Sequence, residues 1–190
     1  MAQVQANAFR GLLKYIKEKA GEEVRKNIID SLTQDRDIYS KPISSGSYPY
    51  PAYIRLIEAI DKEFENRYLN LCKDMGRWAA KRDISETGIY KLYTDDALKT
   101  TLVLKTAPNV MWKGYYDEGK MEAAQLPKTM EEPHSLILRV TDFPEMKRAH
   151  CLLLEGWVEG AFKIITGKDA TVRQTKCITR GDEYCEFVFK

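Results

Sequence analysis

One long segment near the C-terminus constrains this chain more than any other feature. Residues 145 to 166 repeat apolar side chains at helical spacing, and the repeat stops at Gly167, a residue type that commonly ends helices. The polar face of this predicted helix is narrow and holds Arg148, Glu155, Glu159 and Lys163. A helix that is apolar around most of its circumference must be packed on two sides. We therefore expect it to lie between a β-sheet and the N-terminal helices.

Shorter periodic segments surround this helix. Apolar spacing predicts two helices that meet near Gly21, one that starts at Pro51, its continuation after a break near Asn66, and one that begins at Thr94 or Asp95 and stops before Pro108. Strands are predicted from about Gly119, at residues 135 to 140, at 170 to 179 and at 184 to 189. This order predicts an α+β fold, with a small antiparallel sheet of about four strands packed against a helical layer.

The overall composition excludes several classes of protein. The 190 residues suit one domain with a helical extension, so we assign residues 1–38 to N-terminal helices for dimerisation or interaction, and residues 39–190 to the main domain. A net charge of +2 with both signs interspersed gives no basic surface for nucleic acid. The sequence shows neither an apolar run long enough for a membrane helix nor a secretory signal, so we expect a cytoplasmic protein.

Three of the four cysteines form a candidate metal site. If the last two strands form a hairpin centred on Gly181, Cys177 and Cys185 lie opposite each other across a three-residue loop. Cys151 lies on the helix expected to cover that sheet, so three sulfur atoms can converge on zinc, which needs a fourth ligand or a water. Buried reduced thiols, a Cys177–Cys185 disulfide, and cysteines that never meet remain alternatives.

Aromatic and small residues form a candidate ligand pocket. Aromatic and aliphatic walls with few polar groups suit an apolar or aromatic ligand, although core packing uses the same residue types. Gly156 and Gly160 each cost about 1 kcal/mol in a helix, and either close backbone packing or a groove for the ligand explains them. The candidate ligand-binding residues are Tyr90, Trp112, Tyr115, Gly156, Trp157, Gly160 and Phe162.

The C-terminal motif resembles a known family. The helix from Cys151 through "EGWVEG", followed by "CITRGDEYCEF", resembles the core of the V4R (4-vinyl reductase-like) domain. The resemblance extends to about residue 40, through "SSGSYPYPAYIRLIEAID" and "MGRWAAKRDISETGIYKLY". It implies an α+β fold shared with the sensor domains of phenol- and toluene-responsive regulators and, more distantly, with the Bet-type subunits of the TRAPP vesicle-tethering complex. Members are viewed mainly as small-molecule binding modules, often dimeric.

The resemblance also implies a ligand set for zinc. Sensor members bind the metal through three cysteines, which match Cys151, Cys177 and Cys185, and through a glutamate three positions before the second cysteine. Gln174 stands at that glutamate position, and an amide oxygen is a weaker zinc ligand than a carboxylate. Glu155, four residues after Cys151 on the same side of the helix, is a substitute ligand or else a solvated charge.

We therefore predict a small-molecule sensor or carrier domain for a hydrophobic or aromatic ligand, possessing a structural zinc. It is expected to act as a homodimer that passes its signal to a partner output protein. The alternatives are an adaptor subunit of the vesicle-tethering type and a zinc-dependent enzyme. No catalytic residue and no nucleotide cofactor are predicted, because the sequence carries no nucleophile triad, phosphate-binding glycine loop or dinucleotide fingerprint.

Overall fold

The fold is given by a computed structural model, which describes residues 1–39, 45–64, 68–86, 100–126, 136–143 and 146–190. Its elements are β1 (Gln3–Gln5), α1 (Ala6–Ser31), η1 (Thr33–Asp35), α2 (Arg36–Tyr39), β2 (Ser47–Pro49), α3 (Tyr50–Glu63), α4 (Tyr68–Lys81), η2 (Arg82–Glu86), α5 (Thr100–Lys113), β3 (Lys120–Gln125), β4 (Ile137–Thr141), α6 (Arg148–Thr166), β5 (Val172–Lys176), η6 (Ile178–Arg180) and β6 (Cys185–Phe189). The predicted α+β fold is confirmed.

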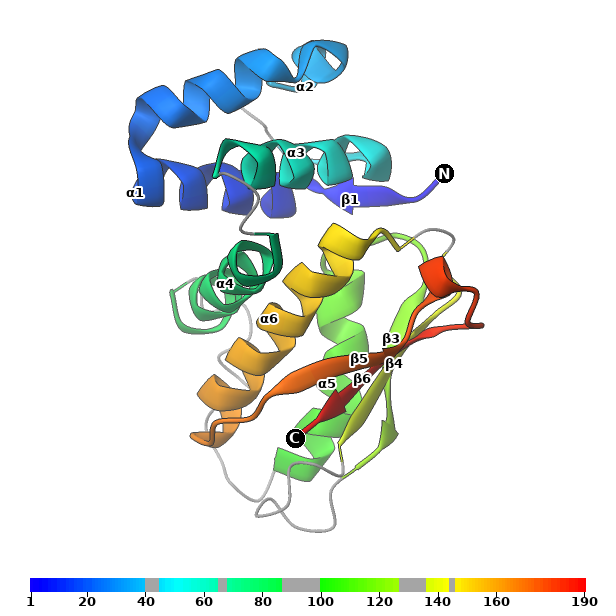
Figure 1. Ribbon diagram of the computed structural model, residues 1–190. Helices are drawn as coiled ribbons and strands as arrows, with labels where there is room; N and C mark the ends of the chain where they lie inside the picture. The colour runs from blue at the N-terminus through cyan, green and yellow to red at the C-terminus, as the bar shows by residue number, and fades with distance from the viewer. Residues whose placement is uncertain (40–44, 65–67, 87–99, 127–135, 144–145) are drawn as a thin grey trace.

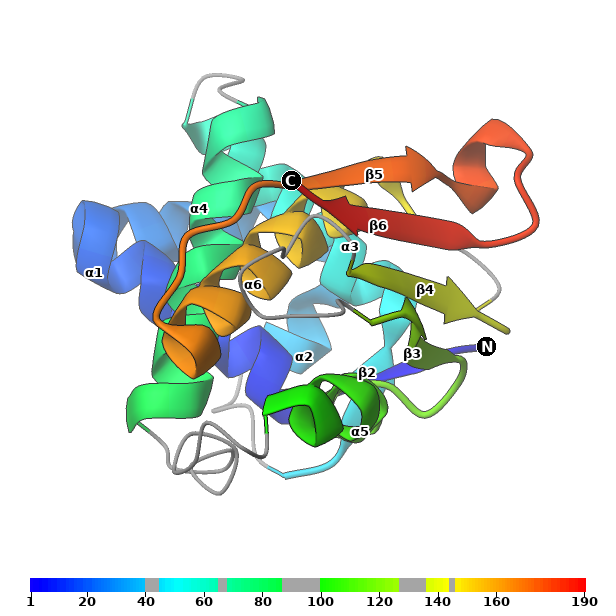
Figure 2. The same ribbon diagram turned by 90° about the horizontal axis from the view of Figure 1, so that it is seen from below.

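A four-stranded antiparallel sheet forms one layer of the molecule. Its strand order is β3-β4-β6-β5, so the C-terminal strand β6 lies inside the sheet and β5 forms an edge. Alternate residues, among them Leu138, Val140 and Phe187, are buried on one face of the sheet. Figures 1 and 2 show α6 crossing this face, while α5 lies beside β3. The sheet therefore supports the long helix, as the sequence predicts.

The second packing face of α6 belongs to α4. A Cβ atom built on Gly156 would lie 2.0 Å from the Lys73 carbonyl oxygen, and one built on Gly76 would lie 2.0 Å from the Leu153 carbonyl oxygen. A Cβ on Gly160 would lie 3.0 Å from the Ala80 Cβ. Side chains at these positions would push the two helices apart. Close approach of two backbones, rather than clearance for a ligand, thus explains the glycines of α6.

Two of the four polar residues of α6 are not in solvent. Glu155 is 4% exposed and Glu159 is 7% exposed, so the prediction that they form a solvated face is wrong. The Val172 backbone N–H donates to Glu159 Oε1 at 2.9 Å, and that of Gln174 donates to Glu155 Oε1 at 3.1 Å. Lys73 Nζ lies 2.6 Å from Glu155 Oε2. The two carboxylates thus accept hydrogen bonds from backbone N–H groups of the edge strand β5.

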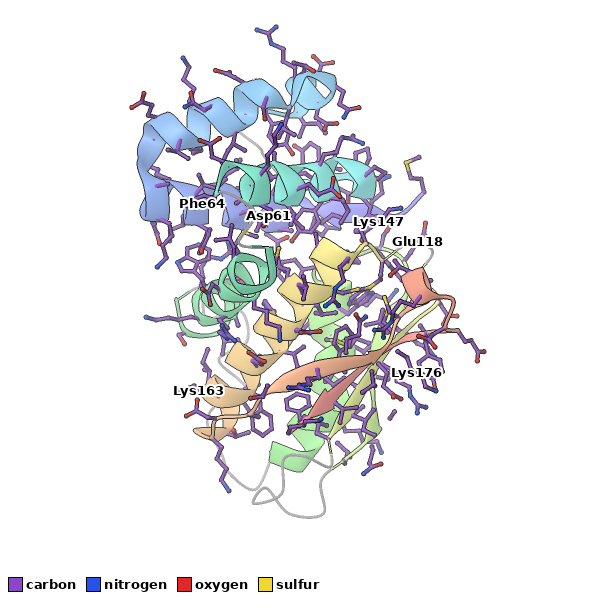
Figure 3. All side chains as sticks on the ribbon, in the orientation of Figure 1. Asp61, Phe64, Glu118, Lys147, Lys163 and Lys176 are labelled. Atoms are coloured by element: carbon purple, nitrogen blue, oxygen red, sulfur yellow. The ribbon has the colours of Figure 1, made fainter. Side chains whose placement is uncertain are left out.

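The remaining polar residues of α6 behave as expected. Arg148 and Lys163 are exposed, and Figure 3 shows Lys163 on the outer side of the helix. At the other end, Lys147 lies where α6 begins, close to α3 (Figure 3), and its backbone N–H donates to the Tyr50 hydroxyl at 3.3 Å. The helix ends at Gly167, which takes the left-handed conformation with φ 71°.

Helix boundaries agree with the sequence except at a proline. Gly21 interrupts α1 with φ 90° and ψ 173°, where the sequence predicts two helices to meet. Pro108, expected to follow the end of a helix, lies inside α5. The helix continues because Met111 and Trp112 beyond the proline are buried in the core, which offsets a cost of about 3 kcal/mol. The predicted break at Asn66 and the predicted start at Thr94 or Asp95 lie outside the described residues.

The N-terminal elements form a layer across α4 and α6. Figure 1 shows α1, α2 and α3 stacked above these helices, and β1 pairs with β2 through Gln3↔Pro49, Val4↔Tyr48 and Gln5↔Ser47. Phe9 and Ile16 of α1 are fully buried. The division of the chain at residue 38 stays a prediction. Within the described part of the chain, every helix is too short or too polar to cross a bilayer.

Candidate functional site

A first cavity lies where the N-terminal layer meets α5 and α6. Its volume is about 40 Å³, and residues from α1, α3, α4, α5, β3 and α6 line it. Trp112, Tyr115 and Trp157 from the predicted ligand-binding set belong to this wall, together with Ala8 and Leu154. The wall is almost entirely apolar, as expected for a site that holds an apolar compound.

A second cavity of about 40 Å³ lies between α5, α6 and the sheet. Phe162, also in the predicted set, lines this cavity with Ala161 and Phe189. Met111, Met121 and Trp157 line both cavities and therefore lie between them. Methionine has three rotatable side-chain bonds and adapts readily to its surroundings. Two of the three residues between the cavities are therefore adaptable.

Other members of the predicted ligand-binding set lie elsewhere. Gly156 and Gly160 face α4 and line neither of these two cavities, although Gly160 lines a separate open groove with Glu159 and Lys163. Their assignment as ligand-binding residues stays a prediction. Tyr90 lies outside the described residues. Sequence reasoning, in turn, missed the methionines between the cavities, because helical spacing makes Met111 look like an ordinary core residue.

A polar cluster borders the first cavity and was also missed. Arg82 and Asp83 begin η2, one π-helical turn, and their side chains are 11% and 4% exposed. Arg82 Nε donates to Asp83 Oδ1 at 2.9 Å. Asp83 Oδ2 accepts hydrogen bonds from the Tyr115 hydroxyl and, at 3.1 Å, from Trp157 Nε1. Two adjacent opposite charges after an amphipathic helix give no sequence signal of burial, since such pairs are usually solvated.

His150 occupies a separate buried network. The Tyr50 hydroxyl lies 2.9 Å from His150 Nδ1, and the Tyr116 hydroxyl lies 2.7 Å from Nε2. The imidazole is 0% exposed, and this burial lowers its pKa to about 3. The ring is therefore neutral near pH 7, with both nitrogen atoms hydrogen-bonded. Because tyrosine hydroxyls engage both ring nitrogens, His150 is not placed to bind a metal at the cysteine cluster.

The three cysteines that the sequence singles out lie together. The sulfur atoms of Cys151, Cys177 and Cys185 are all within 4.8 Å of one another, and Cys151 Sγ lies 3.8 Å from Cys177 Sγ. All three residues are at most 1% exposed, and none forms a disulfide. The Ile178 backbone N–H donates to Cys185 Sγ at 3.5 Å. This arrangement joins α6 to the loop and strand that follow β5.

The local path to this cluster differs from the predicted hairpin. The strands β5 and β6 do pair as an antiparallel hairpin, and Lys176↔Glu186 has the predicted register. The pairing ends there, one residue before Cys177, so the connection runs from Cys177 to Tyr184 and the predicted three-residue loop is wrong. The Cys177 backbone N–H donates to Asp182 Oδ2 at 2.7 Å, which starts a turn in place of further strand pairing. The 3₁₀ turn η6 follows, and it returns the chain so that both sulfur atoms face Cys151.

Gln174 borders the cysteine cluster, whereas Glu155 is held elsewhere. Gln174 Oε1 accepts a hydrogen bond from Arg148 at 3.1 Å, and its Nε2 is buried without a partner of ordinary geometry among the described residues. The amide lies close enough to Cys151 and Cys185 to favour their thiolates. Glu155 is engaged by Lys73 and by β5, which rules against its role as a substitute ligand.

Proton sharing between Cys151 and Cys185 makes the Cys185 sulfur anionic more readily than that of Cys151. A hydrogen bond from the Cys151 thiol, supported by the Ile178 backbone N–H and the Gln174 amide, lowers the pKa of Cys185 to about 6. The same hydrogen bond, together with burial, raises the pKa of Cys151. Thiolates are the form of cysteine that binds metals, so these three residues form a group that could hold a metal ion.

Comparison with known proteins identifies one family match and a common fold. Residues 138–190, which span β4, α6, β5 and β6, match the V4R domain family. No match is found among curated proteins. Solved H-NOX structures share the overall fold: a protein from S. oneidensis in the Fe(II)NO ligation state has 14% identity, a TM-score of 0.70 and 98% coverage of both chains. The H-NOX from Shewanella woodyi in the Fe(II)CO ligation state has 16% identity, a TM-score of 0.65, and 97% and 93% coverage.

A third neighbour comes from a study of heme redox potential and porphyrin distortion, with 11% identity, a TM-score of 0.63, and 98% and 99% coverage. The described residues of this chain do not fit a heme group. Both ring nitrogens of His150, the one histidine among them, bind tyrosine hydroxyls. The first cavity, of about 40 Å³, is far below the roughly 300–1,000 Å³ of sites for drug-sized ligands. The chain is therefore similar to V4R domains in its C-terminal unit and to H-NOX proteins in fold.

Proposed function

We propose that this chain is a small-molecule sensor or carrier domain that binds a hydrophobic or aromatic compound in its interior. The observation that carries the proposal is the pair of apolar cavities separated by Met111 and Met121. A well-packed core leaves few voids larger than a water molecule. Two adjacent voids with flexible side chains between them therefore suit a ligand that enters by displacing the methionines.

We further propose that the cysteine cluster holds a structural zinc. A tetrahedral zinc with sulfur at about 2.3 Å places two sulfur atoms about 3.8 Å apart, which agrees with the 3.8 Å between Cys151 Sγ and Cys177 Sγ. Burial of all three sulfurs favours a closed structural site over a catalytic one with an open position. Gln174 borders the cluster with a neutral amide, whose Nε2 is buried without a hydrogen-bond partner among the described residues.

A role in signalling requires a partner, and residues 1–38 are our proposed interaction surface for a homodimer or an output protein. Figure 1 shows α2 and the second half of α1 on the outside of the molecule, away from the sheet. Three residues of α1, Ala8, Gly11 and Leu12, also line the first cavity. A ligand in that cavity would therefore touch the helix that bears the proposed interface. A cytoplasmic location stays part of this proposal.

The ligand site can be tested by filling each cavity. Acetophenone, a small aromatic probe, should raise the melting temperature of the wild-type chain, because binding to the folded state alone stabilises it. Ala8→Leu fills the first cavity and Ala161→Leu fills the second. Each variant should lose most of the acetophenone-dependent shift measured by differential scanning fluorimetry. Exposed Ala124 lines neither cavity, so Ala124→Leu is the matched control and should keep the shift.

Two results would contradict the ligand site. A wild-type melting temperature that acetophenone leaves unchanged up to millimolar concentration would show that the cavities do not open to a compound of this size. An equal shift in all three leucine variants would show that the probe binds elsewhere on the chain.

A further inference from the structure

The charged side chain in the wall of the first cavity is held between close neighbours from two helices. Among the described residues that line the cavity, Arg82 alone carries a charge. A Cβ atom built on Gly11 of α1 would lie 2.0 Å from Arg82 Nη1. The guanidinium also lies over the Trp78 ring, 5.4 Å from its centroid. The absence of a side chain at Gly11 therefore leaves the space in which the guanidinium lies, at a cost of about 1 kcal/mol to α1.

Other polar groups of this wall already have hydrogen-bond partners, and the Tyr53 hydroxyl interacts with that of Tyr116. Trp112 Nε1 donates to the Glu118 carbonyl oxygen at 2.8 Å, and Trp157 Nε1 donates to Asp83. The Tyr116 hydroxyl is bound to His150. These groups are therefore not available to a ligand without the loss of a buried hydrogen bond, which costs about 1–3 kcal/mol.

Arg82 differs because it has donors to spare. A guanidinium carries five N–H groups, and Arg82 uses Nε and Nη2 to bind Asp83 Oδ1 at 2.9 and 2.5 Å. The Tyr115 hydroxyl also interacts with the guanidinium, but Nη1 makes no hydrogen bond in the described part of the chain, so its N–H groups remain. An acceptor atom on a ligand would satisfy them.

Charge balance decides which kind of acceptor fits. Arg82 and Asp83 neutralise each other, and Asp83 is 3% exposed. A carboxylate ligand would add a negative charge beside Asp83 in an apolar cavity, and an uncompensated buried charge is strongly unfavourable. A neutral oxygen, such as a carbonyl, accepts from the guanidinium without this penalty.

From this arrangement, and resting on the function proposed above, we propose that Arg82 selects the ligand. The ligand class is a neutral, apolar molecule with one hydrogen-bond-accepting oxygen, as in a ketone, an aldehyde or an ester. The oxygen lies against Arg82 Nη1, and the apolar part lies towards Met111 and Met121, which border both cavities.

Three probes of similar size test this assignment: acetophenone (neutral with a carbonyl), ethylbenzene (neutral without an acceptor) and benzoate (anionic). A hydrogen bond to a charged donor contributes about 1.5–3 kcal/mol, which corresponds to an affinity roughly tenfold to a hundredfold higher. By titration calorimetry, wild-type chain should prefer acetophenone over ethylbenzene by such a factor and should bind benzoate more weakly than acetophenone.

Two variants remove the donor in different ways. Arg82→Met combined with Asp83→Asn removes the charge pair together, so that no unpaired charge is left buried. Gly11→Ala keeps Arg82 but places a Cβ where the guanidinium lies. In both variants, the ratio of the affinity for acetophenone to that for ethylbenzene should fall close to one. The affinity for ethylbenzene itself should stay within about threefold of the wild-type value. Arg25, which pairs with Glu22 on α1 and lines neither cavity, provides the matched control Arg25→Met, in which the preference stays.

If a variant fails to fold, a measurement on the wild-type chain tests whether the ligand contacts an arginine. Acetophenone should shift the ¹⁵N-detected guanidinium signal of one arginine, and ethylbenzene should not. Equal affinity of wild type for acetophenone and ethylbenzene, with no guanidinium shift, overturns the assignment of Arg82 while the ligand site itself stands. Tightest binding by benzoate overturns the neutral class. Failure of both neutral probes to bind contradicts the ligand site and, with it, this inference.

Discussion

At the scale of single residues, buried hydrogen-bonded polar groups join α6 to α3 and to the turn before β3. His150 on α6 binds Tyr50 from α3 and Tyr116 from the turn before β3. Tyr50 also accepts the Lys147 backbone N–H, the donor just before α6. A buried group that loses its partner costs more than the hydrogen bond itself contributes, because its desolvation is no longer offset.

We expect Tyr50→Phe to destabilise the chain by about 1–3 kcal/mol, because it leaves His150 Nδ1 and the Lys147 N–H without the hydroxyl. The measurement is the free energy of unfolding from urea denaturation at neutral pH. Half-buried Tyr48, which contacts Phe9 through its ring, provides the control Tyr48→Phe, with an effect within about 0.5 kcal/mol. An equal effect of the two substitutions would contradict the importance of the His150 network.

Whether the position of a single side chain can be predicted from the sequence depends on the residue type. Cys151, Cys177 and Cys185 are chemically distinctive, and their convergence follows from one helix over one sheet. Arg82 and Asp83 are common surface residues, so their burial depends on the π-helical turn and on Gly11 far away in the chain. A contact between ordinary residues that are far apart in the sequence leaves no local pattern, so one sequence alone does not reveal it.

At the scale of elements, α6 connects every layer of the molecule. Its two-sided packing was predictable from the distribution of its apolar residues. The burial of Glu155 and Glu159 was not, because a carboxylate is buried only where specific donors meet it. Those donors are the side chains of Lys73 and Arg77 on α4 and the backbone N–H groups of β5.

The cysteine cluster ties α6 to the β5–β6 connection, and the proposed zinc would lie between these elements. Purified wild-type chain should contain about one zinc per molecule by inductively coupled plasma analysis, and Cys177→Ser should lose it, since two remaining thiolates bind zinc much more weakly. Cys72, the fourth cysteine, lies on α4 outside the cluster. Its variant Cys72→Ala should retain zinc. A metal-free wild type, or equal zinc in both variants, would rule out the site.

At the scale of the whole molecule, the chain shares its fold with H-NOX proteins. The fold class was predictable, because apolar periodicity identifies the helices and strands that the α+β layers require. The resemblance of the C-terminal unit to V4R domains was predictable as well, from its motif. The likeness of the entire chain to H-NOX structures was not, because at 14% identity it appears only when the folded chains are compared.

We propose that the interior of this chain holds an apolar organic compound rather than heme, because the cavities are small and apolar. Native mass spectrometry of the full chain, produced in cells supplied with heme, tests this claim most directly. We expect a folded chain that carries a small apolar compound, which is released when the protein is unfolded. A folded chain that carries one heme per molecule would contradict it.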